Sequence, residues 1–341
     1  MSLPATRRLS GTTLLRSVRE NLAPYRETLE PSGKQVAILR FDTAQDDPPV
    51  RRFRMEAARV SAEQKVKAFS RLGLGVDHRL LPPSISAAEF AGLLTTLNAD
   101  PRTAAIIVQF PPPPRLTPLV QRLAPEKDID GLLEDRSQQR ACATADGIAR
   151  LVLPFAGDNP AIAVVVARGF VGRGVVRLLG DHGLAVRELD AGDDLRAAGQ
   201  ADIVVSATGR PHLLTPDHIR PHHRLVVDSG FMPRADGSVA GDVHPDASSI
   251  PQNITPVPGG VGPVEMAVLM ERIVRQEANP DLTAWTAPAA PYLTRRQVAA
   301  MATSSTVRGV TRPTRTPPQA APDHRSPQPP SPDRGRRGPS L

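Results

Sequence analysis

The chain of 341 residues is long enough for two ordinary domains, and 40% of it is hydrophobic although only 3% is aromatic. Its net charge of +7 lies entirely in residues 285–341, which hold nine Arg, two Asp, no Lys and no Glu. The rest of the chain holds 33 basic and 33 acidic residues, which argues against a nucleic-acid partner.

The cysteine and hydropathy patterns exclude several other classes of protein. The single cysteine, Cys142, excludes an internal disulfide and indicates a reducing compartment, so we expect a cytoplasmic protein. No run of 18 apolar residues occurs, and we expect no membrane partner. The N-terminal sequence MSLPATRRLSGTTLL has no continuous apolar core for a signal peptide and favours an amphipathic helix. The eight histidines show no metal-ligand spacing, so no metal is expected.

The first half of the chain alternates between strand and helix patterns. The expected elements are a buried strand at Gln35–Phe41, a helix at Ala58–Leu72, a helix at Ser86–Asn98 that opens with a capping box, and a strand at Ala104–Phe110 that ends before four prolines. Ser86 and Glu89 form that box.

A second unit of the same kind follows. Its expected elements are strands at Ala161–Ala167, Ala185–Leu189, Asp202–Ala207 and Arg224–Asp228, and helices at Val171–Asp181 and Val264–Arg275. Apolar runs with little alternation are typical of parallel strands covered on both faces. The chain is therefore predicted to have an α/β fold built from two βαβ units in series.

A dinucleotide-binding fingerprint follows the first strand of the second unit. The sequence Ala167-Arg168-Gly169-Phe170-Val171-Gly172 matches G-x-G-x-x-G with Ala in the first place, and a helix follows it. Asp190 lies just beyond the next strand, where a carboxylate can bind the ribose hydroxyls of NAD. Arg168 instead suits the additional phosphate of NADP, so NAD and NADP both stay open as coenzymes.

The loop TPVPGGVGP at Thr255–Pro263 resembles the signature loop of the bifunctional methylenetetrahydrofolate dehydrogenase/methenyltetrahydrofolate cyclohydrolase family. Other family motifs occur in the same order. They are KVKA from Lys65, VQFP from Val108, PEKDIDG from Pro125, ADIVVSATG from Ala201, VDSG from Val227 and GDV from Gly241. The resemblance spans roughly residues 10–276 and implies an N-terminal catalytic domain with a Rossmann-type coenzyme domain.

The resemblance also implies an activity. The family oxidises 5,10-methylenetetrahydrofolate to the 5,10-methenyl cation with NAD(P)+ and then hydrolyses the cation to 10-formyltetrahydrofolate. It suggests a homodimer, and it assigns catalytic roles to Lys65, to Gln109 as its hydrogen-bond partner, and to Asp130 as the group that holds the pterin. A lysine partly buried in such a cleft can have a lowered pKa.

The remaining site residues are expected on the same basis. Ala167, Arg168, Gly169, Gly172, Asp190, Gly209 and Phe231 are expected to bind the coenzyme, and Ser61, Gly262 and Pro263 the folate. The expected domains are residues 1–145, with a helix at 263–284 packing back on them, the coenzyme domain at 146–262, and a disordered Pro- and Arg-rich tail at 285–341.

The chain departs from the family pattern around these sites. Ser61 replaces the family's Tyr four residues before the lysine, the fingerprint is one residue shorter, PCTPxG becomes the sequence CATADG from Cys142, and GPMT becomes GPVE, ending at Glu265. Three interpretations remain open at this point: the bifunctional enzyme, a divergent dehydrogenase-only paralogue, and an inactive binding protein of the same fold.

Overall fold

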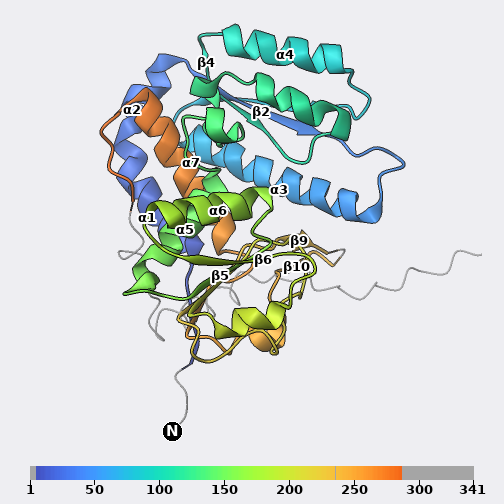
Figure 1. Ribbon diagram of the computed structural model, residues 1–341. Helices are drawn as coiled ribbons and strands as arrows, with labels where there is room; N and C mark the ends of the chain where they lie inside the picture. The colour runs from blue at the N-terminus through green and yellow to red at the C-terminus, as the bar shows by residue number, and fades with distance from the viewer. Residues whose placement is uncertain (1–4, 235, 286–341) are drawn as a thin grey trace, which may run out of the picture. The chain divides into compact units, whose positions relative to one another are not determined.

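A computed structural model describes residues 5–234 and 236–285, and the expected tail from residue 286 onwards lies outside the described residues. The described chain contains two parallel β-sheets with covering helices (Figure 1). The α/β fold class predicted from the sequence is confirmed.

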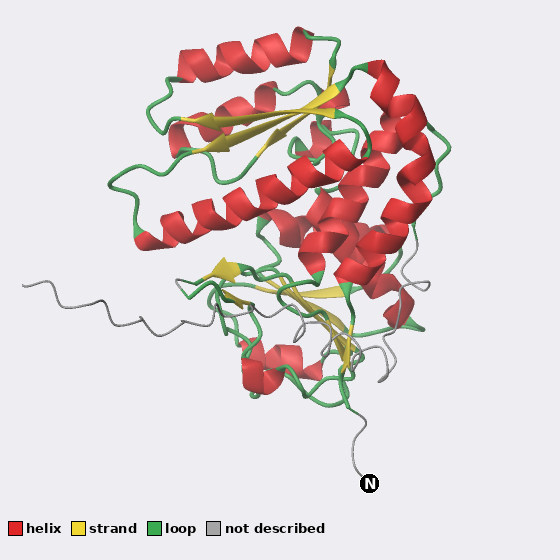
Figure 2. Ribbon diagram, turned by 180° about the vertical axis from the view of Figure 1, so that it is seen from behind, coloured by secondary structure: helices red, strands yellow, loops and turns green. Residues whose placement is uncertain are grey.

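The first sheet has three parallel strands in the order β3-β2-β4. They are β2 (Gln35–Phe41), β3 (Gly75–Leu81) and β4 (Thr103–Val108). Figure 2 shows this sheet between α4 (Ala87–Ala99) and the long helix α3 (Pro49–Arg71).

Successive residues of β2 enter different cores. Val36 and Ile38 pack in the core that includes Phe69 of α3, whereas Leu39 packs with Phe90 of α4. A strand alternates its side chains between the two faces, so a strand covered on both faces is apolar along its length.

The second sheet has six parallel strands in the order β1-β11-β8-β7-β5-β6. Their bounds are Arg7–Arg8 for β1, Asn253–Ile254 for β11, Leu225–Asp228 for β8, Ile203–Ser206 for β7, Ile162–Val165 for β5 and Val186–Leu189 for β6. All six strands run in the same direction, so the loops at their carboxyl ends share one edge, where α/β sheets bind ligands.

Three helices pack together beside these sheets: α1 (Gly11–Leu22), α5 (Ala143–Ala156) and α7 (Val261–Glu277). Helix α7 also contacts α3, and it is almost entirely buried from Met266 to Val274. The polar side chains that it buries are paired: Arg272 Nη2 lies 3.0 Å from Asp146 Oδ2 on α5. This ion pair joins α7 to α5, and α7 lies between α5 and the contact that it makes with α3.

The remaining elements are helix α6 and several shorter segments. They are α2 (Arg26–Leu29), α6 (Phe170–Asp181), the hairpin strands β9 (Met232–Pro233) and β10 (Val239–Ala240), and 3-10 turns at Ala23–Tyr25, Glu30–Ser32, Pro114–Arg122, Pro125–Lys127, Glu134–Arg136, Leu195–Gln200 and Pro245–Ala247. Within the described residues, no helix is both long enough and apolar enough to cross a membrane.

Candidate active site

Lys65 lies in the second half of α3, and its side chain is only 2% exposed. Its Nζ donates to Ser61 Oγ at 3.1 Å and to Gln109 Oε1 at 3.2 Å. Ser61 is one helical turn earlier on the face that Lys65 occupies, as the i, i+4 spacing predicts. The structure therefore brings together three of the residues singled out in the sequence.

Gln109 and Asp130 reach Lys65 from two different loops. Gln109 follows the carboxyl end of β4, and its backbone N–H donates to Leu39 O at 2.8 Å. Asp130 Oδ2 lies 3.9 Å from Lys65 Nζ. The turn that carries Asp130 is held by Asp128, whose carboxylate accepts three backbone N–H hydrogen bonds, from Gly131, Leu132 and Leu133. Asp128 thus performs the turn-forming role, and Asp130 faces the lysine.

A second carboxylate contacts Lys65, and the sequence did not predict this contact. Glu265 Oε1 lies 2.7 Å from Lys65 Nζ, and its side chain is 15% exposed. Glu265 lies near the start of α7, close to Gly262 and Pro263, which form the first turn of that helix. The only signal in the sequence was that Glu265 departs from the family motif, and that signal gave no partner.

The two carboxylates reverse the expected electrostatics of the lysine. Burial acts to lower the pKa of Lys65, but the charges of Glu265 and then Asp130 outweigh it and the pKa is raised. The lowered pKa expected from the sequence is therefore wrong for this state of the site. Burial raises the pKa of Asp130 despite the opposing charge of Lys65, and it raises the pKa of Cys142 to about 12, so the nearby thiol is neutral.

The glycine-rich fingerprint connects β5 to α6 as predicted. Gly169 is the N-cap of α6 and Gly172 lies in its first turn. A Cβ on Gly172 would come within 2.2 Å of Val166 O, so only glycine lets the helix approach the strand this closely. Val166 itself has a φ of 62°, a strained value for a β-branched residue. The N-terminal N–H groups of α6 can bind phosphate oxygens.

The other expected coenzyme residues follow neighbouring strands at the same edge of the sheet. Asp190 follows β6, Gly209 lies in the loop after β7, and Phe231 lies between β8 and β9. Asp190 Oδ1 accepts a hydrogen bond from the Arg168 N–H at 3.2 Å, and its Oδ2 lies 3.6 Å from Arg168 Nε. The two residues that favour different coenzymes are therefore paired with each other.

Two phenylalanines form a stacked pair. Phe110 directly follows Gln109, and Phe170 is the first residue of α6. Their ring centroids are 6.3 Å apart with an interplanar angle of 5°, although Phe110 is 43% and Phe170 37% exposed. Exposed, parallel rings next to polar site residues offer a flat surface for a flat ligand. The sequence analysis did not predict this pair.

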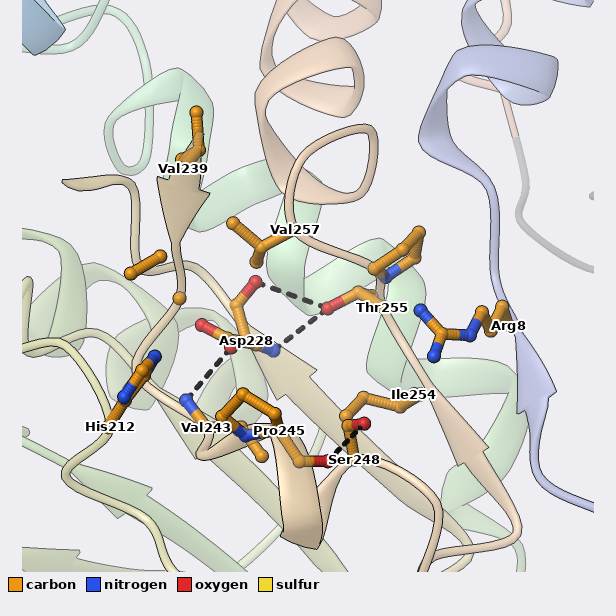
Figure 3. Close-up of a pocket in the computed structure, with 13 residues that line it drawn as sticks. Arg8, His212, Asp228, Val239, Val243, Pro245, Ser248, Ile254, Thr255 and Val257 are labelled. Atoms are coloured by element: carbon orange, nitrogen blue, oxygen red, sulfur yellow. Dashed lines mark hydrogen bonds between the residues drawn. The ribbon is translucent and has the colours of Figure 1, made fainter. Parts of the chain in front are cut away.

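A pocket of about 230 Å³ lies at the carboxyl ends of β8, β11 and β1 (Figure 3). It is lined in part by Arg8, His212, Asp228 and Thr255, and none of the sequence-predicted site residues lines it. Asp228 acts here as a framework residue, because its carboxylate accepts the backbone N–H groups of Gly230, Asp242 and Val243. Within the described residues, no cluster of three or more potential metal ligands occurs.

Two family models match the chain. The model of the tetrahydrofolate dehydrogenase/cyclohydrolase catalytic domain matches residues 9–130, and the model of the corresponding NAD(P)-binding domain matches residues 142–280.

Individual relatives align over most of their own length. The bifunctional protein FolD of Synechococcus sp. (strain CC9902) is 34% identical over 286 residues, which cover 78% of this chain and 93% of that protein. The bifunctional protein FolD of Bordetella avium (strain 197N) is 33% identical over 276 residues, covering 77% and 94%. The crystal structure of the bifunctional enzyme FolD from Campylobacter jejuni superposes with a TM-score of 0.69 at 27% identity, covering 81% of this chain and 100% of that one. The chain therefore belongs to the tetrahydrofolate dehydrogenase/cyclohydrolase family.

Proposed function

We propose that this chain oxidises 5,10-methylenetetrahydrofolate to 5,10-methenyltetrahydrofolate with NAD(P)+ and hydrolyses the product to 10-formyltetrahydrofolate. The observation that carries the proposal is the meeting of Gln109 and Asp130 at the buried Lys65, from three separate segments of the chain. Family membership supplies the reaction, and this meeting supplies the groups that the reaction needs.

Lys65, Gln109 and Asp130 are the proposed catalytic residues. Lys65 exchanges protons with water or a folate nitrogen, Gln109 orients the lysine by accepting its hydrogen bond, and Asp130 accepts hydrogen bonds from the pterin ring. Ser61, Gly262 and Pro263 are the proposed folate contacts.

The coenzyme is the hydride acceptor and is proposed to bind over the fingerprint. Its proposed contacts are Ala167, Arg168, Gly169, Gly172, Asp190, Gly209 and Phe231. The position of these residues at the carboxyl edge of one parallel sheet supports the proposal. Residues 1–145 with the helix at 263–284 are the proposed folate domain, and residues 146–262 the coenzyme domain.

A dehydrogenase-only enzyme is the second candidate function. Ser61 stands where the family carries a tyrosine, and Glu265 pairs with the lysine that hydrolysis needs. We further propose a cytoplasmic homodimer without a membrane or nucleic-acid partner, because the family suggests a dimer and the body of the chain has balanced charge.

One assay separates these possibilities. Purified protein is mixed with 5,10-methylenetetrahydrofolate and either NAD+ or NADP+, and reduced coenzyme and methenyltetrahydrofolate are followed together. Formation of reduced coenzyme without accumulation of the methenyl product indicates both activities. Accumulation of the methenyl product indicates the dehydrogenase alone, and absence of reduced coenzyme with both coenzymes would contradict the proposal.

A further inference from the structure

Lys65 Nζ has a partner for each of its three hydrogens. Ser61 Oγ on α3, Gln109 Oε1 after β4 and Glu265 Oε1 on α7 surround it at 3.1, 3.2 and 2.7 Å. An ammonium group donates three hydrogen bonds and accepts none, so this set of partners fits the charged form of the lysine.

The charges around Lys65 are unbalanced towards the negative. Glu265 and Asp130 are two carboxylates that face one ammonium ion, and the Cys142 thiol adds no charge. Arg272 also acts on Asp130, but its guanidinium donates to Ile129 O, Ala141 O and Asp146 Oδ2.

The two chemical steps place opposite demands on such a site. Oxidation removes a hydride from the methylene carbon and leaves a cation spread over two nitrogens. Hydrolysis adds a water oxygen to that carbon, breaks one carbon–nitrogen bond with its electron pair passing to nitrogen, and releases one proton overall. A negative site stabilises the cation, whereas a lysine fixed as an ammonium ion cannot accept a proton from water.

We propose that Glu265 is a positioning residue that holds Lys65 as an ammonium ion and thereby favours oxidation over hydrolysis in this chain. The inference rests on the proposed function and deepens it. The family motif carries a threonine at this position, so the carboxylate is a feature of this chain and not of the shared mechanism.

The first test compares the two activities in variants of Glu265. Glu265→Gln removes the charge and keeps a hydrogen-bond acceptor, and Glu265→Thr restores the family residue. Glu63→Gln is the matched control, because it removes one carboxylate from the exposed side of α3, two residues from Lys65. At pH 7 we expect the ratio of hydrolysis to oxidation to rise at least about tenfold in both Glu265 variants, the change that accompanies one pKa unit, and to stay unchanged in the control.

The pH profile gives the sign of the effect. The rate of hydrolysis should rise with pH as Lys65 loses its proton, and removal of the Glu265 charge should move this rise to lower pH. If the rise stays at the same pH and the ratio of hydrolysis to oxidation is unchanged in both variants, the inference is overturned. The melting temperatures of the variants serve as the control for folding.

A spectroscopic test does not depend on activity. The chain contains only four lysines, Lys34, Lys65, Lys67 and Lys127, so 13C-labelled lysine gives four side-chain Cε signals in an NMR titration. Lys65→Arg assigns the Lys65 signal by its loss. We expect this signal to titrate at a lower pH in Glu265→Gln than in the unaltered protein, and an identical midpoint would show that Glu265 does not hold the ammonium ion.

The two tests separate the failure of the inference from the failure of the proposed function. If the unaltered protein has neither activity, the proposed function is overturned, and with it the claim that oxidation is favoured over hydrolysis. The titration midpoint of the Lys65 signal would still show whether Glu265 holds the ammonium ion. An active protein whose Lys65 midpoint and activity ratio ignore Glu265 would overturn the inference alone.

Discussion

Replacing Lys65 with methionine tests whether the lysine holds the buried charges of the site together. Lys65 is 2% exposed, and Glu265 and Asp130 beside it are 15% and 12% exposed. Breaking a buried ion pair by removing one partner destabilises a protein by about 3–5 kcal/mol, because the other charge stays buried without compensation. For a body of this size, Lys65→Met should therefore lower the Tm by roughly 5–9 °C near pH 8.

The loss should depend on pH with a defined sign. Burial already raises the pKa of Asp130, and without the opposing charge of Lys65 it rises further above the value in the unfolded chain. The penalty is then fully present above the raised folded-state pKa and disappears as the pH falls towards the unfolded value near 4. Thermal melts at pH 8 and pH 5 should show a difference between Lys65→Met and the unaltered protein that shrinks at the lower pH.

A second substitution serves as the control for this reasoning. Lys65→Met combined with Glu265→Gln leaves one unpaired carboxylate instead of two, so it should recover a large part of the lost stability at pH 8. Cyclohydrolase activity should be absent from both variants. If Lys65→Met melts like the unaltered protein at pH 8, the three charges are not coupled in the folded state.

Three further changes have measurable outcomes. Asp190→Ser should shift the ratio of kcat/KM for NADP to kcat/KM for NAD in favour of NADP by about 1 kcal/mol. The value is small because Arg168 is 83% exposed and its pair with Asp190 is screened by solvent; an unchanged ratio would mean that Asp190 does not face the ribose. Phe110→Ala should raise the KM for the folate or for the coenzyme roughly 2- to 12-fold, since an aromatic stack contributes about 0.5–1.5 kcal/mol. Phe110→Leu is the control, and unchanged KM values for both would show that the ring contacts neither ligand. Truncation after Trp285 should leave the Tm unchanged, whereas truncation after Ala284 should cost about 1–3 kcal/mol. The backbone N–H of Trp285 donates to the buried carboxylate of Glu271 on α7, and the Trp285 ring centroid lies 4.8 Å from the Arg150 guanidinium; equal melts would contradict this.

The sequence predicted the elements whose apolar residues enter the cores. The predicted strand Gln35–Phe41 matches β2, and the capping box at Ser86 is present at the start of α4. The edge strand β3 was not predicted, because it is mostly exposed and its sequence GVDHRLL is polar at the centre. Helix α3 begins at Pro49, nine residues before its predicted start, in a segment rich in arginine that shows no apolar periodicity.

The site was predicted only as far as residue identities allow. The resemblance to the family assigned Lys65, Gln109 and Asp130 to the site. In the structure, the side chains of Gln109 and Asp130 lie within 3.9 Å of Lys65 Nζ. The resemblance could not supply Glu265, since residues 200 positions apart in the chain carry no sign of contact in a single sequence. The direction of the Lys65 pKa shift could not be predicted for the same reason. Burial alone lowers this pKa, and the carboxylates that raise it were not known to be neighbours from the sequence.

The departures from the family pattern are connected in space, which changes their meaning. Ser61 and Glu265 both contact the same Nζ, at 3.1 and 2.7 Å. A tyrosine at position 61 carries a larger side chain on the same helix face, and a threonine at position 265 carries no charge. The two differences therefore act on one group: the first places a small hydroxyl beside the lysine, and the second adds a carboxylate to hold it.

Divergence at a site by such paired changes alters the charge and shape of the environment around Lys65 while it leaves Lys65, Gln109 and Asp130 in place. On this view the chain differs from the family pattern in how tightly its lysine is held, and the Lys65–Glu265 pair is the contact through which that difference acts.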